Sequence, residues 1–555
     1  MRIQRKAAIV VYMLAFISLL TAQDTGPSAL QAGPSAPEDT EIRLPTKLLE
    51  VPELRTDVVK AVLPESSALE TPHMEIPLPQ ESDLQIAESA FNLPAPGSPA
   101  GGRVTGNTES SFFSDGVLGA GSMNHILGAL SLYKLGSNPR FRFNFSHEGL
   151  DGYNFEKPGA GYFNTEDVIS GWVAGDGDVL DAETEATFRE EQNGLQGSND
   201  YYAVDNRYLT GTGSLIYTPT DLLFFKAAVD AASTGKILSV KQNIEPPREA
   251  EVYARPALTA GFNLKKFTLR LRTGYNFRYV SESGITDNQS LEARLGMETS
   301  IRDSIFLSGG IGGYWAFDNE AEIPFDLGIT LNAADLLSFQ AEGGFRVRKL
   351  SFTGLWQDVP LLAIGAQGNG DLQDVREWYG TGGFTWKIMP EAVTLNGTVN
   401  YAFAENAVVL QPYDTVTSSF PYTQESLQTL QPTLSLALRR NIFALRMEWT
   451  GNLMDRTPLM PEQKFTLSAE ATEKSERWGA NFSSEVDLYD SPVMPRLGLG
   501  GFVKVTDGVR LVAEASDLLA PIISGGRPTI GDQVTSDFPF IEPGFRFILK
   551  TEVSL

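Results

Sequence analysis

The chain has 555 residues, 52 glycines and a formal net charge of -25. It contains no cysteine, which excludes a disulfide framework, a thiolate metal site and a cysteine nucleophile. Its 3 histidines are scattered, and the net charge has the wrong sign for general nucleic-acid binding. The composition therefore predicts no cofactor, no metal centre and no nucleic-acid partner.

The first residues predict export. A basic start with Arg2 and Arg5 is followed by an uncharged, mostly apolar run, Ala7–Leu20, and by the small residue Ala22. This order is typical of a secretory signal peptide, predicted at residues 1–22. An uncleaved anchor is the alternative, but the run is shorter than the roughly 20 apolar residues that a spanning helix needs.

Residues 23–102 are predicted to form a disordered, acidic periplasmic tether. Within residues 23–100 lie 12 of the 32 prolines and 13 Asp or Glu residues against 4 Lys or Arg residues. Proline removes backbone donors and breaks helices, so this composition favours an extended chain. Apolar residues repeatedly precede proline, as in Val51-Pro52 and Leu78-Pro79. Two interpretations stay open: a plain spacer, or a segment that docks on a periplasmic partner or folds into a lumen.

From about residue 103 the hydrophobic period is two. In residues 267–279, for example, Leu269 and Leu271 alternate with Thr268 and Arg270. Successive side chains of a strand point to opposite faces, so each such segment has one apolar and one polar face. The same alternation occurs at residues 141–146, 291–298, 339–348 and 478–488.

Short turns alternate with long polar loops along this region. The long loops include residues 357–377, 405–430 and 518–541. Strand, short turn, strand and long loop is the order of a transmembrane β-barrel, whose short turns face the periplasm. The predicted short turns are Gly136–Pro139, Gly175–Asp178, Pro219–Asp221, Asn263–Lys265, Arg302–Ser304, Asn332–Asp335, Pro390–Glu391, Arg439–Asn441, Glu473–Glu476 and Thr506–Gly508.

The predicted fold is all-β: a large antiparallel transmembrane barrel over residues 103–555. Ten short-turn hairpins, a first strand near residues 103–113 and a last strand at the C-terminus give about 18–22 strands. A soluble secreted β-protein is an alternative, because the strands of a sandwich also alternate.

The last predicted strand has a strongly apolar face. Phe545, Phe547, Leu549, Val553 and Leu555 share this face, and charged or polar residues occupy the other. Such a pattern predicts an outer-membrane strand with one face toward lipid.

Charged residues on the polar face of the strands predict a water-filled lumen. An Arg or Lys on the lipid face costs about 2–4 kcal/mol at the membrane midplane, so these side chains should point inward. They either form a solvated, mutually paired wall or an electrostatic lining that filters solutes. The candidate lumen-lining residues are Arg270, Arg272, Arg278, Arg294, Arg346, Arg348, Glu292, Glu298 and Glu342.

Motifs for metal binding or catalysis are weak. The acidic stretch 175–181 lacks the spacing and closing glutamate of a calcium loop, so it is interpreted as a polar turn. Ser122, His125 and His147 have the residue types of a hydrolase site, but no nucleophile elbow accompanies them. The sequence therefore predicts a protein that is not an enzyme.

Residues 103–555 resemble Gram-negative outer-membrane β-barrels, and most closely the barrel of TonB-dependent receptors. The features that carry the resemblance are the number of strands, the run from Gly119 to Tyr133 at the barrel start and the C-terminal strand. The resemblance implies the outer membrane as location, its lipid as surroundings and recognition of the last strand by the barrel-assembly machinery. Those receptors carry a folded plug before the barrel, whereas residues 23–102 show no recognisable plug domain.

Two functions follow from this sequence. The preferred hypothesis is an outer-membrane channel or transporter barrel for hydrophilic solutes, gated or partnered through residues 23–102. A barrel of this size leaves a wide opening, so loops, this segment or a partner must narrow it. The alternative is a structural or adhesive surface protein that binds partners through its long extracellular loops.

Overall fold

The computed structural model describes most of the chain from Phe112 onward. The predicted signal peptide 1–22, the tether 23–102 and the terminal Leu555 lie outside the described residues and stay predictions. The described ranges are 112–135, 138–197, 201–240, 248–264, 266–281, 288–302, 304–317, 321–334, 336–364, 372–414, 417, 419–455, 460–489, 494–522 and 540–554.

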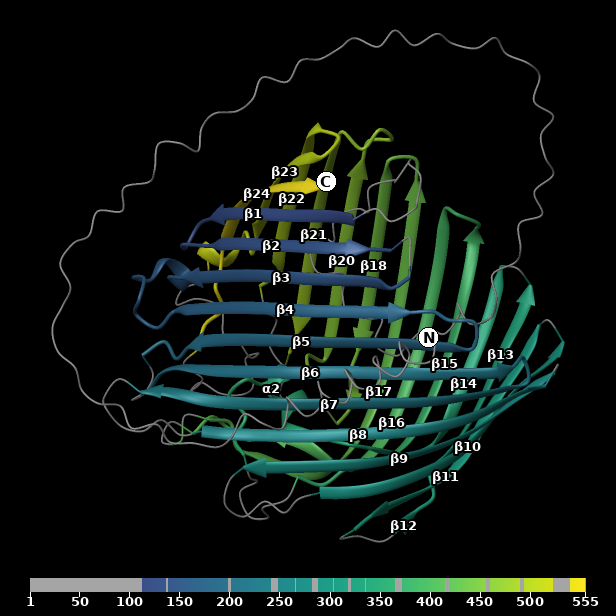
Figure 1. Cartoon of the computed structure of the whole chain (residues 1–555). Helices are drawn as coiled ribbons and strands as arrows, with labels where there is room; N and C mark the ends of the chain where they lie inside the picture. Colours follow the sequence, from purple (N-terminus) through teal and green to yellow (C-terminus); the bar gives the residue numbers. More distant parts are fainter. Residues whose placement is uncertain are drawn as a thin grey trace, which may run out of the picture. The chain divides into compact units, whose positions relative to one another are not determined.

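The described strands form one antiparallel sheet that closes on itself (Figure 1). Strand β1 (Phe112–Gly121) pairs with β2 (Ile126–Lys134) on one side and with the last strand, β24 (Arg546–Ser554), on the other. The closing register runs from Asp115 opposite Ser554 to Gly121 opposite Ile548. Because the first and last strands pair, the sheet closes into a barrel, and each described strand except the two-residue segments is hydrogen-bonded on both sides.

The sheet contains 24 strand segments, which correspond to 22 strands across the barrel. The two-residue segments β12 (Ala321–Glu322) and β19 (Leu453–Met454) continue β13 (Phe325–Ala334) and β18 (Phe443–Gly451). They pair with the same neighbours, β11 (Ile305–Ala316) and β17 (Tyr422–Arg440), so 24 minus 2 gives 22. The all-β barrel and the upper end of the predicted strand count are confirmed.

The remaining strands follow in chain order around the barrel. They are β3 (Arg140–Asp151), β4 (Phe163–Gly175), β5 (Leu180–Gly194), β6 (Tyr201–Thr220), β7 (Leu223–Val240), β8 (Arg248–Leu264), β9 (Phe267–Ser281), β10 (Asn288–Arg302), β14 (Leu337–Arg348), β15 (Val375–Met389), β16 (Val393–Leu410), β20 (Gln463–Thr472), β21 (Trp478–Leu488), β22 (Arg496–Thr506) and β23 (Val509–Ser516).

The ten predicted short turns all fall at junctions between consecutive strands, but other boundaries differ from prediction. The first strand was placed near residues 103–113, whereas β1 is Phe112–Gly121; its glycines hide the alternation. The loop predicted at 405–430 shrinks because β16 extends to Leu410 and β17 starts at Tyr422. The start of β17 carries polar residues on both faces, which resembles a loop in sequence but suits a strand that rises into water.

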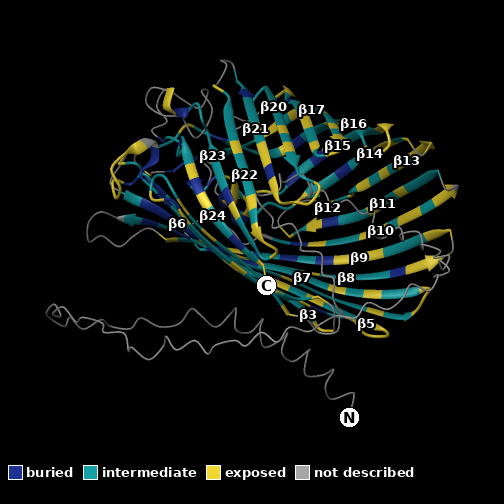
Figure 2. Cartoon of the chain, turned by 90° about the horizontal axis from the view of Figure 1, so that it is seen from above, coloured by how far each residue is buried: buried dark blue, intermediate teal, exposed yellow. Residues whose placement is uncertain are grey.

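Helices are short and lie in the connections. Helix α2 (Phe352–Asp358) is in the β14–β15 connection, and the 3₁₀ turns η2 (Tyr153–Phe155) and η3 (Ala520–Ile522) are in two others. No helix among the described residues is long and apolar enough to cross a membrane. In Figure 2 the buried residues gather toward one end of the barrel rather than along its full length.

Candidate functional site

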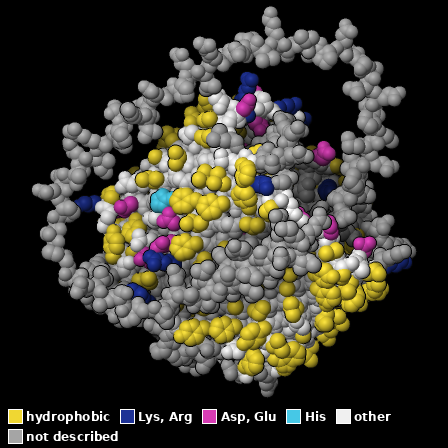
Figure 3. All heavy atoms as spheres, viewed as in Figure 1, with side chains coloured by type: hydrophobic (Ala, Val, Ile, Leu, Met, Phe, Trp, Pro, Cys, Tyr) yellow, Lys and Arg dark blue, Asp and Glu magenta, His cyan; other side chains and the backbone are white. Residues whose placement is uncertain are grey.

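The sheet has an apolar face and a polar face, as the alternation predicts. Leu271, Leu295 and Leu327 are 49%, 50% and 69% exposed on the apolar face, and Figure 3 shows such side chains spread over the outside. The polar face carries helix α2, whose core includes side chains of β6, β7 and β9 and of β16 and β17. These two groups of strands are not neighbours, so one connection reaches both only from inside the closed sheet. The polar face is therefore the inner wall.

The predicted lumen-lining residues lie on this inner wall, in β9, β10 and β14. On β9 and β10, Arg270 contacts Glu298 at 2.6 Å and Arg272 contacts Glu292 at 3.7 Å. Lys349, just after β14, also contacts Glu292 at 3.0 Å. The first two ion pairs join the neighbouring strands β9 and β10, whereas Lys349 reaches Glu292 from the end of β14. All of these side chains are partly exposed. Any effect of these side chains on a solute stays a prediction.

The pairing continues across the next strands of the same wall. Arg294 of β10 pairs with Asp326 of β13. Glu377 of β15 contacts both Arg346 and Arg348 of β14, at 3.2 Å and 3.7 Å. Positive charges on this wall are thus balanced locally by carboxylates, which favours a mixed rather than a single-sign lining.

Two of the nine predicted residues have other partners. Glu342 accepts a hydrogen bond of 2.8 Å from the Tyr379 hydroxyl. Arg278 is only 2% exposed and donates to backbone carbonyls of the connection above it. The two residues therefore differ from the other seven, which form ion pairs among the described side chains.

Glycines on the inner wall let the charged side chains lie flat. A Cβ added at Gly310 would come within 2.7 Å of Arg294 Nε and 3.1 Å of Asp326 Oδ1. A Cβ added at Gly274 would come within 2.6 Å of Glu292 Oε1. Because glycine has no side chain, these ion pairs can run along the wall instead of projecting into the lumen.

The inner wall is covered at one end by part of the β14–β15 connection. Its described residues, 349–364 and 372–374, are hereafter called the docked loop. Its α2 side chains Phe352 and Trp356 are 0% exposed and pack in one core with Tyr208 of β6 and Tyr422 of β17. The Phe352 and Tyr422 rings lie 6.3 Å apart. Burying two large aromatic rings strongly favours docking.

Other connections join the same core at this end of the barrel. Leu195 follows β5, Phe420 precedes β17 and Phe540 precedes β24. The Phe420 amide donates to the Leu361 carbonyl at 2.8 Å, which ties the β16–β17 connection to the docked loop. Segments distant in sequence thus form a single apolar core at the end of the barrel opposite the short turns.

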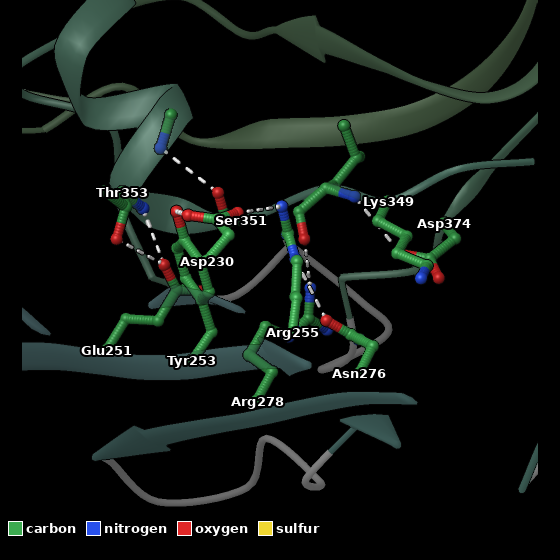
Figure 4. A network of polar contacts seen from close by, with 12 residues as sticks. Asp230, Glu251, Tyr253, Arg255, Asn276, Arg278, Lys349, Ser351, Thr353 and Asp374 are labelled. Carbon is green, nitrogen blue, oxygen red and sulfur yellow. Dashed lines mark hydrogen bonds and ion pairs between the residues drawn. The ribbon is translucent and has the colours of Figure 1, made fainter. Parts of the chain in front are cut away.

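Polar wall residues hold the start of the docked loop (Figure 4). Glu251 of β8 is 0% exposed and accepts hydrogen bonds from the Phe352 amide at 2.9 Å and the Thr353 amide at 2.7 Å. The Thr353 hydroxyl lies 2.8 Å from the Glu251 carboxylate and 2.7 Å from the hydroxyl of Thr234 on β7. A buried carboxylate thereby satisfies the free amides at the start of α2.

Two cations bind other backbone carbonyls of the docked loop. Arg278 of β9 donates to the carbonyls of Leu350, at 2.9 Å, and Leu372, at 2.7 Å. Lys236 of β7 donates to the Leu362 carbonyl at 2.7 Å and to Glu249 at 2.9 Å. Both ends and the middle of the loop are therefore bonded to wall side chains through loop backbone atoms.

Desolvation also acts on the loop itself: it raises the pKa of the Asp358 carboxyl at the end of α2. A carboxylate in such surroundings favours its protonated form.

The docking of this connection is not predicted by the sequence pattern, which indicates a long polar loop at residues 357–377. A signal was available. Phe352, Trp356 and the pair Leu361-Leu362 form an apolar group inside this connection, and Ser351 precedes it as an N-cap. An apolar group between two long strands indicates a connection that needs a wall to pack against.

Three of the five residues predicted for the apolar face of the C-terminal strand lie within β24: Phe547, Leu549 and Val553. In β24, Phe547 and Leu549 are exposed on the apolar face, and Val553 pairs with Gly116 of β1. Phe545 directly precedes the strand. Its recognition by an assembly machinery stays a prediction.

The weak motifs form no catalytic or metal constellation among the described residues. No group of three or more potential metal ligands occurs there. His125 contacts Glu148 at 2.9 Å and His147 contacts Asp167 at 2.8 Å. Ser122 instead accepts a hydrogen bond from the Phe547 amide at 2.9 Å. The three residues are thus engaged in separate contacts.

The structure is similar to several solved outer-membrane proteins. It matches the siderophore receptor PirA from Acinetobacter baumannii with a TM-score of 0.62 and 9% identity, over 81% of each chain. It matches the FrpB iron transporter from Neisseria meningitidis with a TM-score of 0.62 and 9% identity, over 80% of this chain and 82% of that one. The copper transporter OprC gives a TM-score of 0.58 and 14% identity, over 80% and 81%.

These similarities concern the fold. No protein-family profile matches the sequence, and no curated protein matches it. The matched structures are named as receptors and transporters, not as enzymes.

A closed antiparallel sheet with an apolar outer face is a structure that can span a membrane. The chain has the fold of a Gram-negative outer-membrane β-barrel, and among these it resembles the barrels of TonB-dependent receptors.

Proposed function

We propose that the chain passes hydrophilic solutes across the outer membrane. The observation that carries this proposal is the inner wall, where paired arginine and carboxylate side chains line a closed barrel of 22 strands (24 minus 2 continuations). Polar side chains on this face suit a hydrated path, and the flat ion pairs over Gly274 and Gly310 keep it wide.

The N-terminal segment is proposed to control this path from the periplasm. The similar structures are named as a siderophore receptor, an iron transporter and a copper transporter. Residues 23–102 precede β1 and carry repeated apolar-proline units suited to binding a groove or a lumen. After export by residues 1–22, the C-terminal strand is proposed to guide assembly into the lipid.

A second function has one observation in its favour. The apolar core formed by the docked loop with Phe420 and Phe540 narrows the end of the barrel opposite the short turns. A barrel closed in this way would suit a surface protein that binds partners through its external connections.

Single-channel recording in planar bilayers separates these functions. The mature chain is compared with a variant that lacks residues 24–100. Large current steps from either chain support solute passage, and steps that appear only after the deletion assign the segment as a plug or gate. Silence from both folded chains, together with retained binding by the external loops, would support the surface-binding function instead.

A further inference from the structure

The wall charges beneath the docked loop have unusual partners. Glu251 and Arg278 are 0% and 2% exposed, yet neither forms an ion pair with another described residue. Each is bonded to amides, carbonyls or a hydroxyl of the loop. A buried charge with only dipoles as partners is costly compared with the same charge in water. The charged wall therefore loses solvation when the loop docks and regains it when the loop leaves.

The wall also offers these two charges another partner. On the inner face Tyr253 of β8 lies opposite Arg278 of β9, and Glu251 lies opposite Val280. Glu251 and Arg278 are thus diagonal neighbours on adjacent strands, a separation that long side chains span. Without the loop, the carboxylate and the guanidinium can pair with each other. The wall accordingly has two satisfied arrangements, one with the loop and one without it.

The loop is bonded to the wall at its base, and none of its described charged side chains pairs with Glu251 or Arg278. Lys349 contacts Glu292 at 3.0 Å, and Asp374 accepts hydrogen bonds from the Leu350 amide at 3.2 Å and from Tyr314. These contacts fix where the loop leaves and rejoins the wall. Between them, the groups that Glu251 and Arg278 bind are backbone atoms and the Thr353 hydroxyl, which water can satisfy after undocking.

We propose that the docked loop is a displaceable gate, latched to the wall by Glu251 and Arg278, which pair with each other when the loop leaves. This inference rests on the proposed solute passage. The aromatic core of Phe352 and Trp356 favours the closed state, and the rehydrated wall favours the open one. A gate with two satisfied wall arrangements switches between discrete states rather than deforming continuously.

A reversible cross-link tests the gate directly. The chain has no cysteine, so a double variant introduces the only pair. The Thr234 and Thr353 hydroxyls lie 2.7 Å apart, and T234C/T353C would join wall to loop. The matched control is T433C/T450C, whose hydroxyls lie 3.2 Å apart on the paired strands β17 and β18, away from the loop. Both are made in the chain lacking residues 24–100, and cross-linking is verified by mass.

The gate predicts that oxidised T234C/T353C loses its current steps and that reductant restores them, with at least a tenfold change in open probability. The T433C/T450C control should conduct equally in both redox states. Equal currents from oxidised and reduced T234C/T353C would overturn the gate. A chain with residues 351–372 replaced by a short Gly-Ser turn separates the two proposals: if it conducts while the cross-link has no effect, only the gate fails. If it is silent as well, solute passage fails and the gate with it.

A charge-removing variant adds an independent test. E251Q keeps the size of the side chain but removes the charge that the α2 amides and Thr353 bind. In glutamine one carboxylate oxygen becomes an NH2 group, which cannot accept the hydrogen bond of a loop amide, whereas the remaining oxygen can still accept one from Arg278 when the loop leaves. A buried amide left without an acceptor disfavours the closed state, so open probability should rise about tenfold. E298Q, which alters the Arg270 partner further along the wall, is the control and should leave gating unchanged. A fall or no change in open probability for E251Q, in a correctly folded barrel, would contradict the latch.

Discussion

Charged residues serve two different purposes on the two parts of the inner wall. On β9–β15, Arg270 and Glu298, or Arg346 and Glu377, pair with each other and are partly exposed. Beneath the docked loop, Glu251 and the buried cations bind loop backbone instead. The first arrangement is complete without any other segment, whereas the second is completed only by the loop. The same residue types thus form a lining in one region and a docking surface in the other.

The largest expected effect comes from removing the aromatic core of the docked loop. W356A deletes a fully buried side chain, and such truncations cost about 3–5 kcal/mol. We expect the loop to undock while the barrel stays folded. A cysteine reporter at Val359, which is buried in the docked loop, should react much faster with an impermeant maleimide in W356A than in the otherwise unchanged V359C chain. Equal labelling rates would mean that the core does not hold the loop.

In the region of β9–β15, where wall charges pair with each other, conductance should depend on the space beside the ion pairs and not on docking of the loop. G310V places a side chain where Arg294 lies, and the flexible arginine must move to make room. Arg294 should turn into the lumen, lowering unitary conductance without altering maleimide labelling at position 359. The control is G171V, because a Cβ at Gly171 meets nothing within 4 Å. Identical conductance for G310V and G171V would show that ion pairs lying along the wall do not determine the width of the solute path.

Individual ion pairs of the lining should matter less for stability. The Arg270 and Glu298 side chains are 38% and 49% exposed, and exposed pairs contribute about 0.2–1 kcal/mol. A double-mutant cycle of R270A and E298A, followed by urea unfolding in detergent, should give a coupling energy within that range. A coupling several times larger would mean that this pair behaves like the buried contacts under the loop.

The smallest expected effect is a pH dependence of docking. Desolvation raises the pKa of Asp358 in the docked state, so docking is favoured where this carboxyl is protonated. Acidification from neutral pH should slow maleimide labelling at position 359, and labelling should increase as pH rises through the shifted pKa. D358N should slow labelling at neutral pH and reduce the pH dependence. Faster labelling of D358N than of the unchanged chain at neutral pH would contradict the expectation that the uncharged side chain favours docking.

Sequence patterns predicted the barrel well because period-two alternation and short turns are local. The run from Leu269 to Arg272 identifies a strand and its two faces without any partner. The docked loop was not predicted, because its partners are distant: Glu251 precedes Thr353 by about a hundred positions. In sequence, Glu251 and Arg278 resemble the other charges of the polar face, and only the fold shows that a loop covers them. The first strand was misplaced because glycines in β1 weaken the alternation.

The most direct experiment measures the largest sugar that each chain admits in a liposome-swelling assay. It asks whether the loop, rather than the wall, restricts passage. Three chains are compared, all lacking residues 24–100: one otherwise unchanged, one with residues 351–372 replaced by a short Gly-Ser turn, and one carrying E298Q. If the loop restricts passage, only the chain with the shortened loop should admit clearly larger sugars than the unchanged chain. The same size limit for all three chains, with verified insertion, would contradict it.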